Sequence, residues 1–167
     1  MKYLKFSNVK SLLSICSALL FLSITATKAD TTAQNIQSVQ TAFDAWRAGT
    51  GGPFALLAPE ATWTITGNSI AAKKYNSRDE FMDVVIKPFN ARLTKPLVPT
   101  MRGLHAEGDM VIAYFDAEAT ANDGKPYRNT YAWFMQMKDG KIVNVTAFFD
   151  ALEFDEFWKR VEPRADR

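Results

Sequence analysis

Cysteine and histidine are almost absent from this chain, and their scarcity excludes several kinds of functional site. Its 167 residues include one cysteine, Cys16, and one histidine, His105. A single histidine cannot build a multi-histidine metal centre, and a single cysteine cannot close a disulfide within the chain. The sequence also has no phosphate-binding loop and no Ser–His or Cys–His triad pattern. We therefore expect no metal and no organic cofactor.

Long hydrophobic runs are also missing, apart from one near the N-terminus. Three lysines lie among the first ten residues, and a short apolar run follows at 12–24. Small residues then flank Lys28, as a cleavage site requires. This order is typical of a secretory signal peptide, and the run is too short to cross a membrane comfortably. We expect cleavage after Ala29, which gives a signal peptide at 1–29 and one domain at 30–167.

Two other interpretations of this N-terminus are an uncleaved membrane anchor and a lipoprotein modified at Cys16. Bulky Ile15 stands where a lipoprotein signal needs a small residue, so the second is the weaker. Cleavage after Ala29 removes four lysines and no acids, which leaves 16 basic and 18 acidic side chains and a net charge of −2. That balance provides no basic patch for nucleic acid. We expect a periplasmic or secreted bacterial protein without membrane contact after cleavage.

Three segments have the periodicity of amphipathic helices. The first covers 31–48, and the third closes the chain at 152–161. The second begins at Ser77 with a capping box that ends at Glu80, and Pro88 is expected to kink it. Their apolar stripes contain Ile36, Val39, Phe43 and Trp46; Phe81, Val84, Val85 and Phe89; and Phe154, Phe157, Trp158 and Val161.

The segment 108–150 has the pattern of an antiparallel meander. Val, Ile, Tyr, Phe and Trp fill three runs, and two Asp-Gly turns separate them. A further strand is expected at 61–66, and another begins at Thr100 after a breaker at Lys95–Pro99. Helices segregated from an antiparallel sheet indicate an α+β fold. We expect a cone-shaped barrel, in which a curved antiparallel sheet wraps on the N-terminal helices around a pocket, with a helix at the C-terminus.

Several short motifs resemble the SnoaL-like branch of the nuclear transport factor two-like (ketosteroid isomerase-like) superfamily. They are WTITG at 63–67, YNSRDEF at 75–81, GDMVI at 108–112, DGKI at 139–142 and FFD at 148–150. The resemblance covers nearly all of the expected domain and implies the same cone-shaped fold. It does not select an activity, because the superfamily includes polyketide cyclases, ketosteroid isomerases, epoxide hydrolases and proteins of no known activity.

Most catalytic residues that the resemblance implies are absent. The general base of SnoaL-like cyclases and limonene-type epoxide hydrolases corresponds to Ala147, and the histidine of the cyclases corresponds to Trp133. The base of ketosteroid isomerases corresponds to Thr64. The arginine and second aspartate of the epoxide hydrolases correspond to Tyr114 and Asp116. Only Asp116 is retained, so none of these activities transfers as a whole.

The strand register of the meander decides which side chains would face the pocket. We predict a two-residue turn at 123–124, which places Asp116 opposite Tyr131, and a three-residue turn at 138–140. A first turn longer by one residue would reverse this pairing. Trp63 is a further ligand-binding candidate, although it is most simply a core residue. The predicted pocket face carries Tyr114, Asp116, Glu118, Asn129, Tyr131, Trp133, Ala147 and Phe149.

Asp116 is the predicted catalytic base or acid, with Tyr131 as its partner. A carboxyl group among Tyr and Trp side chains would lose water, which raises its pKa, and Tyr131 would donate to an oxyanion. The alternative is a purely structural hydrogen bond between the two. Glu118 is expected to be solvated, and Asn129 would either orient a carbonyl or tie down a strand edge. Asp150 is expected to cap the last helix, and the alternative is that it faces the pocket.

Three functions remain open on the sequence alone. The first is an exported, cofactor-free proton-transfer enzyme of isomerase, cyclase or lyase type that acts on a small apolar molecule. The second is a small-ligand-binding protein that has lost the family's base. The third is a dimeric interaction domain with a filled cone. The other face of the meander is also apolar, and such a face usually marks a partner surface, so we expect a homodimer through the sheet.

Overall fold

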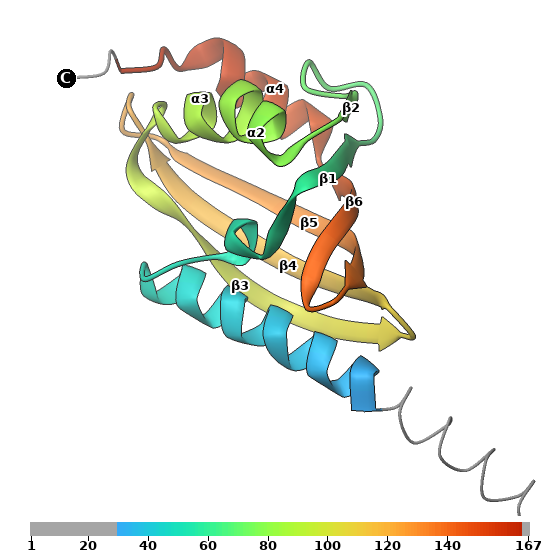
Figure 1. Ribbon diagram of the computed structural model, residues 1–167. Helices are drawn as coiled ribbons and strands as arrows, with labels where there is room; N and C mark the ends of the chain where they lie inside the picture. The colour runs from blue at the N-terminus through green and yellow to red at the C-terminus, as the bar shows by residue number, and fades with distance from the viewer. Residues whose placement is uncertain (1–29, 165–167) are drawn as a thin grey trace, which may run out of the picture.

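The computed structural model describes residues 30–164 (Figure 1), so the predicted signal peptide at 1–29 lies outside the described residues. Six strands form one sheet: β1 (Leu57–Ile65), β2 (Lys74–Tyr75), β3 (Leu93–Glu107), β4 (Met110–Ala121), β5 (Pro126–Lys138) and β6 (Lys141–Phe149). The helices are an N-terminal helix (30–48), the 3₁₀ turn η1 (Pro53–Leu56), α2 (Arg78–Phe81), the π-helical turn η2 (Met82–Ile86), α3 (Lys87–Asn90) and α4 (Ala151–Arg160).

The sheet is curved, open and mixed. Its strand order is β2-β1-β6-β5-β4-β3. The run from β3 to β6 is the predicted antiparallel meander, whereas β1 pairs with β6 in parallel. The α+β class and the cone shape are therefore confirmed. The expected all-antiparallel sheet is wrong, because the parallel pairing of β1 with β6 makes the sheet a mixed one.

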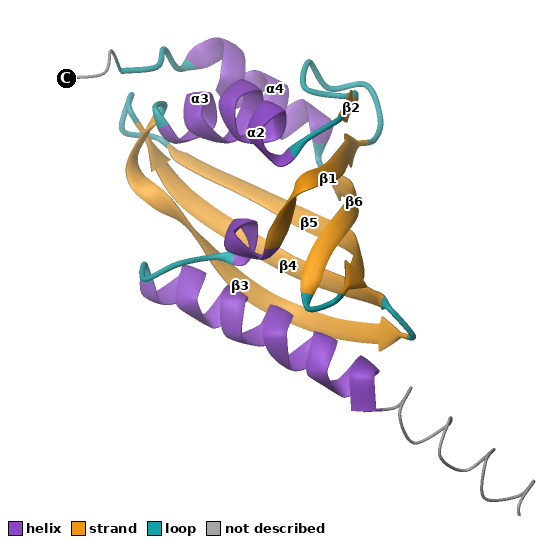
Figure 2. Ribbon diagram, in the orientation of Figure 1, coloured by secondary structure: helices purple, strands orange, loops and turns teal. Residues whose placement is uncertain are grey.

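Helices lie along the concave side of this sheet and at one end of it (Figure 2). The N-terminal helix packs through Phe43, whose ring lies 5.0 Å from that of Phe115 and 5.8 Å from that of Trp133. At the other end α3 meets α4, where the rings of Phe89 and Phe157 are 5.1 Å apart. The concave face is thus covered at both ends by apolar contacts.

The expected breaker at Lys95–Pro99 is wrong, because β3 runs straight through it from Leu93. Strand β3 lies at the edge of the sheet, where a proline without an N–H removes no ladder hydrogen bond on the solvent side. Its pairing with β4 also shifts twice between Leu93 and Val98, and such bulges accommodate the extra residues. Pro96 and Pro99 therefore lie within β3 and do not end it.

The helical segment from α2 to α3 confirms the predicted cap. The backbone N–H of Glu80 donates to Ser77 Oγ at 3.1 Å, and the Glu80 carboxylate accepts from the N–H of Asn76 at 2.7 Å. The predicted kink at Pro88 takes the form of a wider turn: the N–H of Lys87 donates to the carbonyl of Met82. Proline leaves one helical carbonyl without its usual donor, and a π turn just before it is one accommodation of that loss.

The turn between β4 and β5 differs from the prediction by one residue. Ala121 and Lys125 pair, so the loop has three residues, 122–124, with Gly124 at a φ of 81°. Asp116 consequently lies opposite Thr130. The predicted three-residue turn at 138–140 is wrong as well, because Lys138 pairs with Lys141. The β5–β6 turn therefore has two residues, Asp139 and Gly140, both with positive φ, as the mirror-image hairpin turn requires.

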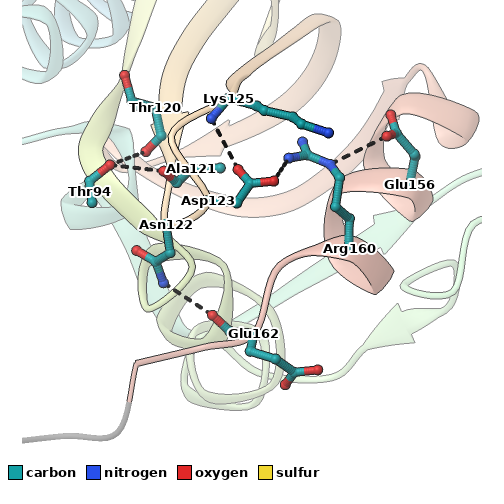
Figure 3. A network of polar contacts seen from close by, with 9 residues as sticks. All are labelled: Thr94, Thr120, Ala121, Asn122, Asp123, Lys125, Glu156, Arg160 and Glu162. Atoms are coloured by element: carbon teal, nitrogen blue, oxygen red, sulfur yellow. Dashed lines mark hydrogen bonds and ion pairs between the residues drawn. The ribbon is translucent and has the colours of Figure 1, made fainter.

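Tertiary contacts explain the longer first turn (Figure 3). The side-chain amide of Asn122 donates to the carbonyl of Glu162 at 3.1 Å and to that of Ala91 at 2.8 Å. Its backbone N–H donates to the carbonyl of Arg92, which makes it unavailable for the hairpin ladder. Asp123, next in the turn, pairs with Arg160 of α4. The turn is therefore anchored to α4 and to the start of β3, and these contacts set its length.

Candidate functional site

An apolar cavity of about 560 Å³ lies between the concave face of the sheet and the helices. Its size is that of pockets that take small organic molecules. Strands β1, β5 and β6 form one wall, and the N-terminal helix, η1, α2 to α3, the start of β3 and α4 form the rest. The lining includes Trp46, Gly52, Phe54, Trp63, Ile65, Phe81, Val85, Phe89, Asn90, Leu93, Thr94, Leu97, Tyr131, Trp133, Ala147, Phe149 and Phe154.

Aromatic rings dominate this lining. Trp133 of β5 stacks on Trp46 of the N-terminal helix, with ring centroids 5.8 Å apart and planes 15° apart. Trp63 of β1 stacks on Phe81 of α2 at 4.1 Å and 9°. The ring of Phe54 lies 5.8 Å from that of Trp133 and 5.9 Å from that of Trp63. The walls are therefore flat, rigid and apolar, which favours a flat apolar ligand.

Polar side chains are few in the lining, and none of the lining residues is Asp, Glu, His, Lys or Arg. Thr94 already donates to the carbonyls of Thr120 and Ala121 at 3.1 and 3.0 Å. Tyr131 is the only lining residue with a side chain that loses a proton within the usual pH scale. Among residues 30–164, therefore, no general base of the carboxylate or imidazole kind lines the cavity.

Tyr131 belongs to a short hydrogen-bonded group on β5. Its hydroxyl lies 2.9 Å from that of Tyr127, and the Tyr127 hydroxyl accepts from Asn129 Nδ2 at 3.0 Å. Burial raises the pKa of Tyr127 to about 12 and raises the pKa of Tyr131 well above its ordinary value. Both phenols are therefore protonated at neutral pH.

Asp116 lies on the outer face of the sheet, so its predicted position in the pocket is wrong. Because Asp116 pairs with Thr130, its side chain points away from the inner row formed by Phe115, Tyr131 and their neighbours. Hydrogen bonds from Thr130 at 2.7 Å and Arg102 at 2.5 Å hold the pKa of this carboxyl below its usual range. The expected rise in its pKa is therefore also wrong, because the group is charge-paired and partly exposed to solvent.

Tyr114 and Glu118 share the outer face with Asp116, against the predicted register. Arg102 donates to the Tyr114 hydroxyl at 2.8 Å, and Arg128 donates twice to Glu118, at 3.1 and 3.0 Å. This second contact holds the pKa of Glu118 below its ordinary value. Its exposure agrees with the expectation that Glu118 is solvated. A shallow polar cleft on this side contains the Asp116 and Glu118 pairs.

Five of the predicted site residues do line the cavity: Trp63, Tyr131, Trp133, Ala147 and Phe149. Trp133 lies directly opposite Ala147, and Tyr131 opposite Phe149, which keeps all four on the inner face. Ala147, where the resemblance implied an aspartate, is buried in the wall. The structure thus brings these five together and excludes Tyr114, Asp116 and Glu118.

Asn129 of β5 is hydrogen-bonded to Asp150, which follows the end of β6. This is the structural role predicted for Asn129, in which its amide ties down a strand edge. Its Oδ1 accepts from the backbone N–H of Asp150 at 2.9 Å, and its Nδ2 donates to the carbonyl of the same residue at 3.0 Å. The expected cap at Asp150 is confirmed, because its carboxylate accepts from the N–H groups of Leu152 and Glu153. Asn129 lies beside the cavity, behind Tyr131, and is not part of its lining.

The sequence also placed several lining residues in the core. Trp46, Phe89 and Phe154 were assigned to apolar helix stripes, and periodicity alone cannot separate a ring that packs on a neighbour from one that borders a void. The sequence contains no signal that distinguishes these two cases. Among residues 30–164 no group of three or more His, Cys, Asp or Glu could hold a metal ion. Within the same range no helix is long and apolar enough to span a membrane.

Comparisons with known proteins agree with this architecture. The family model of the SnoaL-like domain matches residues 39–145. A nuclear transport factor two-like (NTF2-like) protein from Burkholderia thailandensis is 25% identical, over 74% of this chain and 95% of its own, with a TM-score of 0.61. No curated protein is a significant match.

Two further solved structures share the fold at lower identity. TerC, co-crystallized with polyporic acid, is 17% identical over 75% of this chain and 98% of its own, with a TM-score of 0.60. An LEH-like epoxide hydrolase of M. tuberculosis is 13% identical over 78% of this chain and 92% of its own, with a TM-score of 0.54. These likenesses show the NTF2-like fold.

Proposed function

The chain belongs to the SnoaL-like domain family, and we propose that it binds a small, neutral and largely apolar molecule in its cavity. The composition of the lining carries this proposal. Aromatic and aliphatic side chains surround a space of about 560 Å³, and no lining residue carries a formal charge at neutral pH. A charged ligand would have to bury its charge without a partner, which is unfavourable.

The lining argues against the proton-transfer enzyme that the sequence kept open. Asp116, the predicted base, lies outside the cavity in contact with Arg102. Ala147 supplies no proton acceptor. Tyr131 remains protonated at neutral pH, because burial raises its pKa, so it offers a hydrogen-bond donor and not a base. Ligand binding without a carboxylate base is the function that this site supports best.

The third possibility, a filled cone, is also disfavoured. Trp133 lies in the wall, stacked on Trp46, and leaves the cavity open beside it. The neighbour TerC was crystallized with polyporic acid, which supports a ligand-holding role for this shape of fold in at least one related structure. We therefore favour an occupied cavity over a purely structural one.

A matched pair of fluorescent probes tests the proposal. N-phenyl-naphthylamine is neutral, and anilinonaphthalene sulfonate is its sulfonated counterpart, so the two differ mainly in charge. We expect the neutral probe to bind saturably, with a fluorescence rise and one site per chain. We expect the sulfonate to bind at least about tenfold more weakly, because no cation in the lining would pair with it. Equilibrium fluorescence titration measures both affinities.

The opposite ranking would contradict the proposal. Tighter binding of the sulfonate than of the neutral probe would indicate a basic site that the lining does not contain. Absence of saturable binding by the neutral probe, up to its solubility limit, would equally reject it. Competition between the two probes separates binding at the cavity from adsorption elsewhere on the surface.

We also propose that the protein works outside the cytoplasm, in the periplasm or as a secreted protein. The support is the basic start, the short apolar run and the small residues around Lys28 in the sequence. Mass spectrometry of the protein recovered from the periplasm would find Asp30 at the N-terminus. An intact Met1 in that fraction would reject cleavage after Ala29.

We further propose that two copies associate through the outer face of the sheet. Apolar side chains form adjacent cross-strand rows there, with Ile112 opposite Phe134 and Ala132 opposite Phe148. Phe148 is 46% exposed, although large apolar side chains usually seek cover. The acids Asp116 and Glu118 on this face are paired within the chain, so the face is close to neutral and can meet its own copy.

Substituting Phe148→Glu is expected to convert a dimer into a monomer. In an isologous interface each copy would bury the charge of its own introduced glutamate without a partner. Sedimentation velocity at micromolar concentration should give twice the chain mass for the wild type and the single mass for the variant. Leu152→Glu, at an 84% exposed site on α4, is the control and should stay dimeric. A monomeric wild type would contradict this proposal.

A further inference from the structure

Three side chains of β5 form a hydrogen-bond chain that ends at the cavity. Asn129 Nδ2 donates to the hydroxyl of Tyr127 at 3.0 Å, and that hydroxyl lies 2.9 Å from the hydroxyl of Tyr131. Tyr131 lines the cavity, whereas Tyr127 and Asn129 lie behind it. Either phenol could donate to the other on distance alone. The direction of the chain decides what Tyr131 offers to a ligand.

The backbone fixes the orientation of the Asn129 amide. Its Oδ1 accepts from the N–H of Thr130 at 2.8 Å and from the N–H of Asp150 at 2.9 Å. Backbone N–H groups can only donate, so the amide oxygen must face them and the amide nitrogen must face the other way. There it meets two oxygens, the carbonyl of Asp150 at 3.0 Å and the hydroxyl of Tyr127.

This orientation sets the direction of the remaining bond. The oxygen of Tyr127 already accepts from Asn129, and the side chain is completely buried, at 0% exposure. Within residues 30–164 the other hydrogen-bond neighbour of its hydroxyl is Tyr131. If Tyr131 were the donor, the proton of Tyr127 would be buried without an acceptor, which is unfavourable. Tyr127 therefore donates to Tyr131.

The hydroxyl proton of Tyr131 then has no hydrogen-bond acceptor within residues 30–164. Its hydroxyl has only Tyr127 as a hydrogen-bond partner within residues 30–164, and that bond uses its oxygen. A buried hydroxyl needs an acceptor for its proton, and Tyr131 is the one member of this hydrogen-bond chain that lines the cavity, where a ligand could supply the acceptor. Burial also keeps the proton on Tyr131, because the pKa of the phenol is raised well above its ordinary value.

We propose that Asn129 determines ligand specificity from behind the cavity, by directing the chain so that Tyr131 presents a hydrogen-bond donor to the ligand. The ligand class is then a flat, neutral, apolar ring system with one carbonyl oxygen, such as an aromatic ketone, placed to accept from Tyr131. This inference rests on the proposed ligand-binding function and adds the chemistry of its single polar contact. Asn129 is a positioning residue, since it acts through Tyr127 and does not touch the ligand.

Fluorenone and fluorene test the inference, since they share a flat tricyclic shape and differ in the carbonyl oxygen. We expect the wild type to bind fluorenone about five- to tenfold more tightly than fluorene, the effect of one additional hydrogen bond. In Tyr131→Phe the two probes should bind within about twofold of each other. Isothermal titration calorimetry measures the affinities for both probes. The carbonyl stretch of bound fluorenone, measured by infrared difference spectroscopy, should lie at lower frequency in the wild type than in Tyr131→Phe.

Two further variants test the direction of the chain. In Asn129→Asp the carboxylate donates nothing and accepts from Tyr127, so Tyr131 turns its proton toward Tyr127 and the preference for fluorenone should disappear. Tyr127→Phe serves if that variant does not fold. It removes the donor to Tyr131 and leaves the Tyr131 proton free for the ligand, so the preference should persist within about twofold.

Each contrary result has a distinct meaning. Equal binding of the two probes by the wild type would overturn the inference and leave the proposed ligand-binding function standing. A preference that rises severalfold in Tyr127→Phe would show that Tyr131 donates to Tyr127 in the wild type, which also overturns it. Failure of the wild type to bind either probe would overturn the proposed function, and this inference with it.

Discussion

Replacing Trp133 by alanine is expected to lower the free energy of unfolding by about 3–5 kcal/mol, the range for removing a buried tryptophan or phenylalanine side chain. Trp133 is 5% exposed, and its indole lies near rings of the N-terminal helix, η1, β1, β4 and β5. Centroid distances run from 4.9 Å to 6.2 Å, to Phe43, Trp46, Phe54, Trp63, Phe115 and Tyr131. No single neighbour can move into the space without losing contacts of its own.

Urea denaturation followed by circular dichroism measures this loss. Leu152→Ala is the matched control, because it also truncates a large apolar side chain but at an 84% exposed site. The control should stay within about 0.5 kcal/mol of the wild type. A loss below about 1 kcal/mol for Trp133→Ala would show that the aromatic cluster does not hold the sheet and the N-terminal helix together.

Substituting Ala147→Trp is expected to weaken binding of N-phenyl-naphthylamine by at least about a hundredfold. Ala147 is buried on the inner face of β6, opposite Trp133, and lines the cavity. An indole at this position would occupy the space between the walls that the ligand needs. The neutral probe would then lose most of the apolar surface that it buries on binding, and each tenfold loss in affinity corresponds to about 1.4 kcal/mol.

Thr146→Trp is the control for this substitution. Thr146 precedes Ala147 on the same strand, and its side chain faces the outer side of the sheet, opposite Phe134. The same bulk added there should leave the affinity for the probe within about threefold of the wild type. Equal weakening in both variants would indicate a general disturbance of β6, and unchanged binding in Ala147→Trp would place the probe outside the cavity.

The N-terminal helix, the helical segment that begins at Ser77 and the hairpins of the meander could be predicted from the sequence because they have strong local signals. The stripe on the N-terminal helix, the cap at Ser77 and the Asp-Gly turns all specify local geometry, and all are present in the structure. The continuation of β3 through Pro96 could not be predicted in the same way. It depends on the strand being at the edge of the sheet, which is a property of the assembled fold.

Strand register is the feature that local sequence signals predict least well. The β5–β6 pairing differs from the predicted one by two residues, with a bulge near Gln136, and an even shift keeps every side chain on its face. The β4–β5 pairing differs by one, and an odd shift reverses every side chain of β4. Asn122 causes that difference, since its groups bond to Arg92 and Glu162 instead of to the hairpin.

The one-residue difference in the β4–β5 register explains which predicted site residues lie on the inner face and which do not. Residues of β5 and β6, including Trp133 and Ala147, were placed correctly because their shift was even. Residues of β4, including Asp116, were placed on the wrong face. The absence of a base at Ala147 could be read from the sequence, whereas the absence of Asp116 from the cavity could not.

A crystal structure of the protein with N-phenyl-naphthylamine bound tests the central claim most directly. The account predicts electron density for one probe molecule in the cavity, in contact with Trp63, Trp133 and Ala147. Density for the probe only on the outer face of the sheet, beside Phe148, with the cavity unchanged, would contradict it.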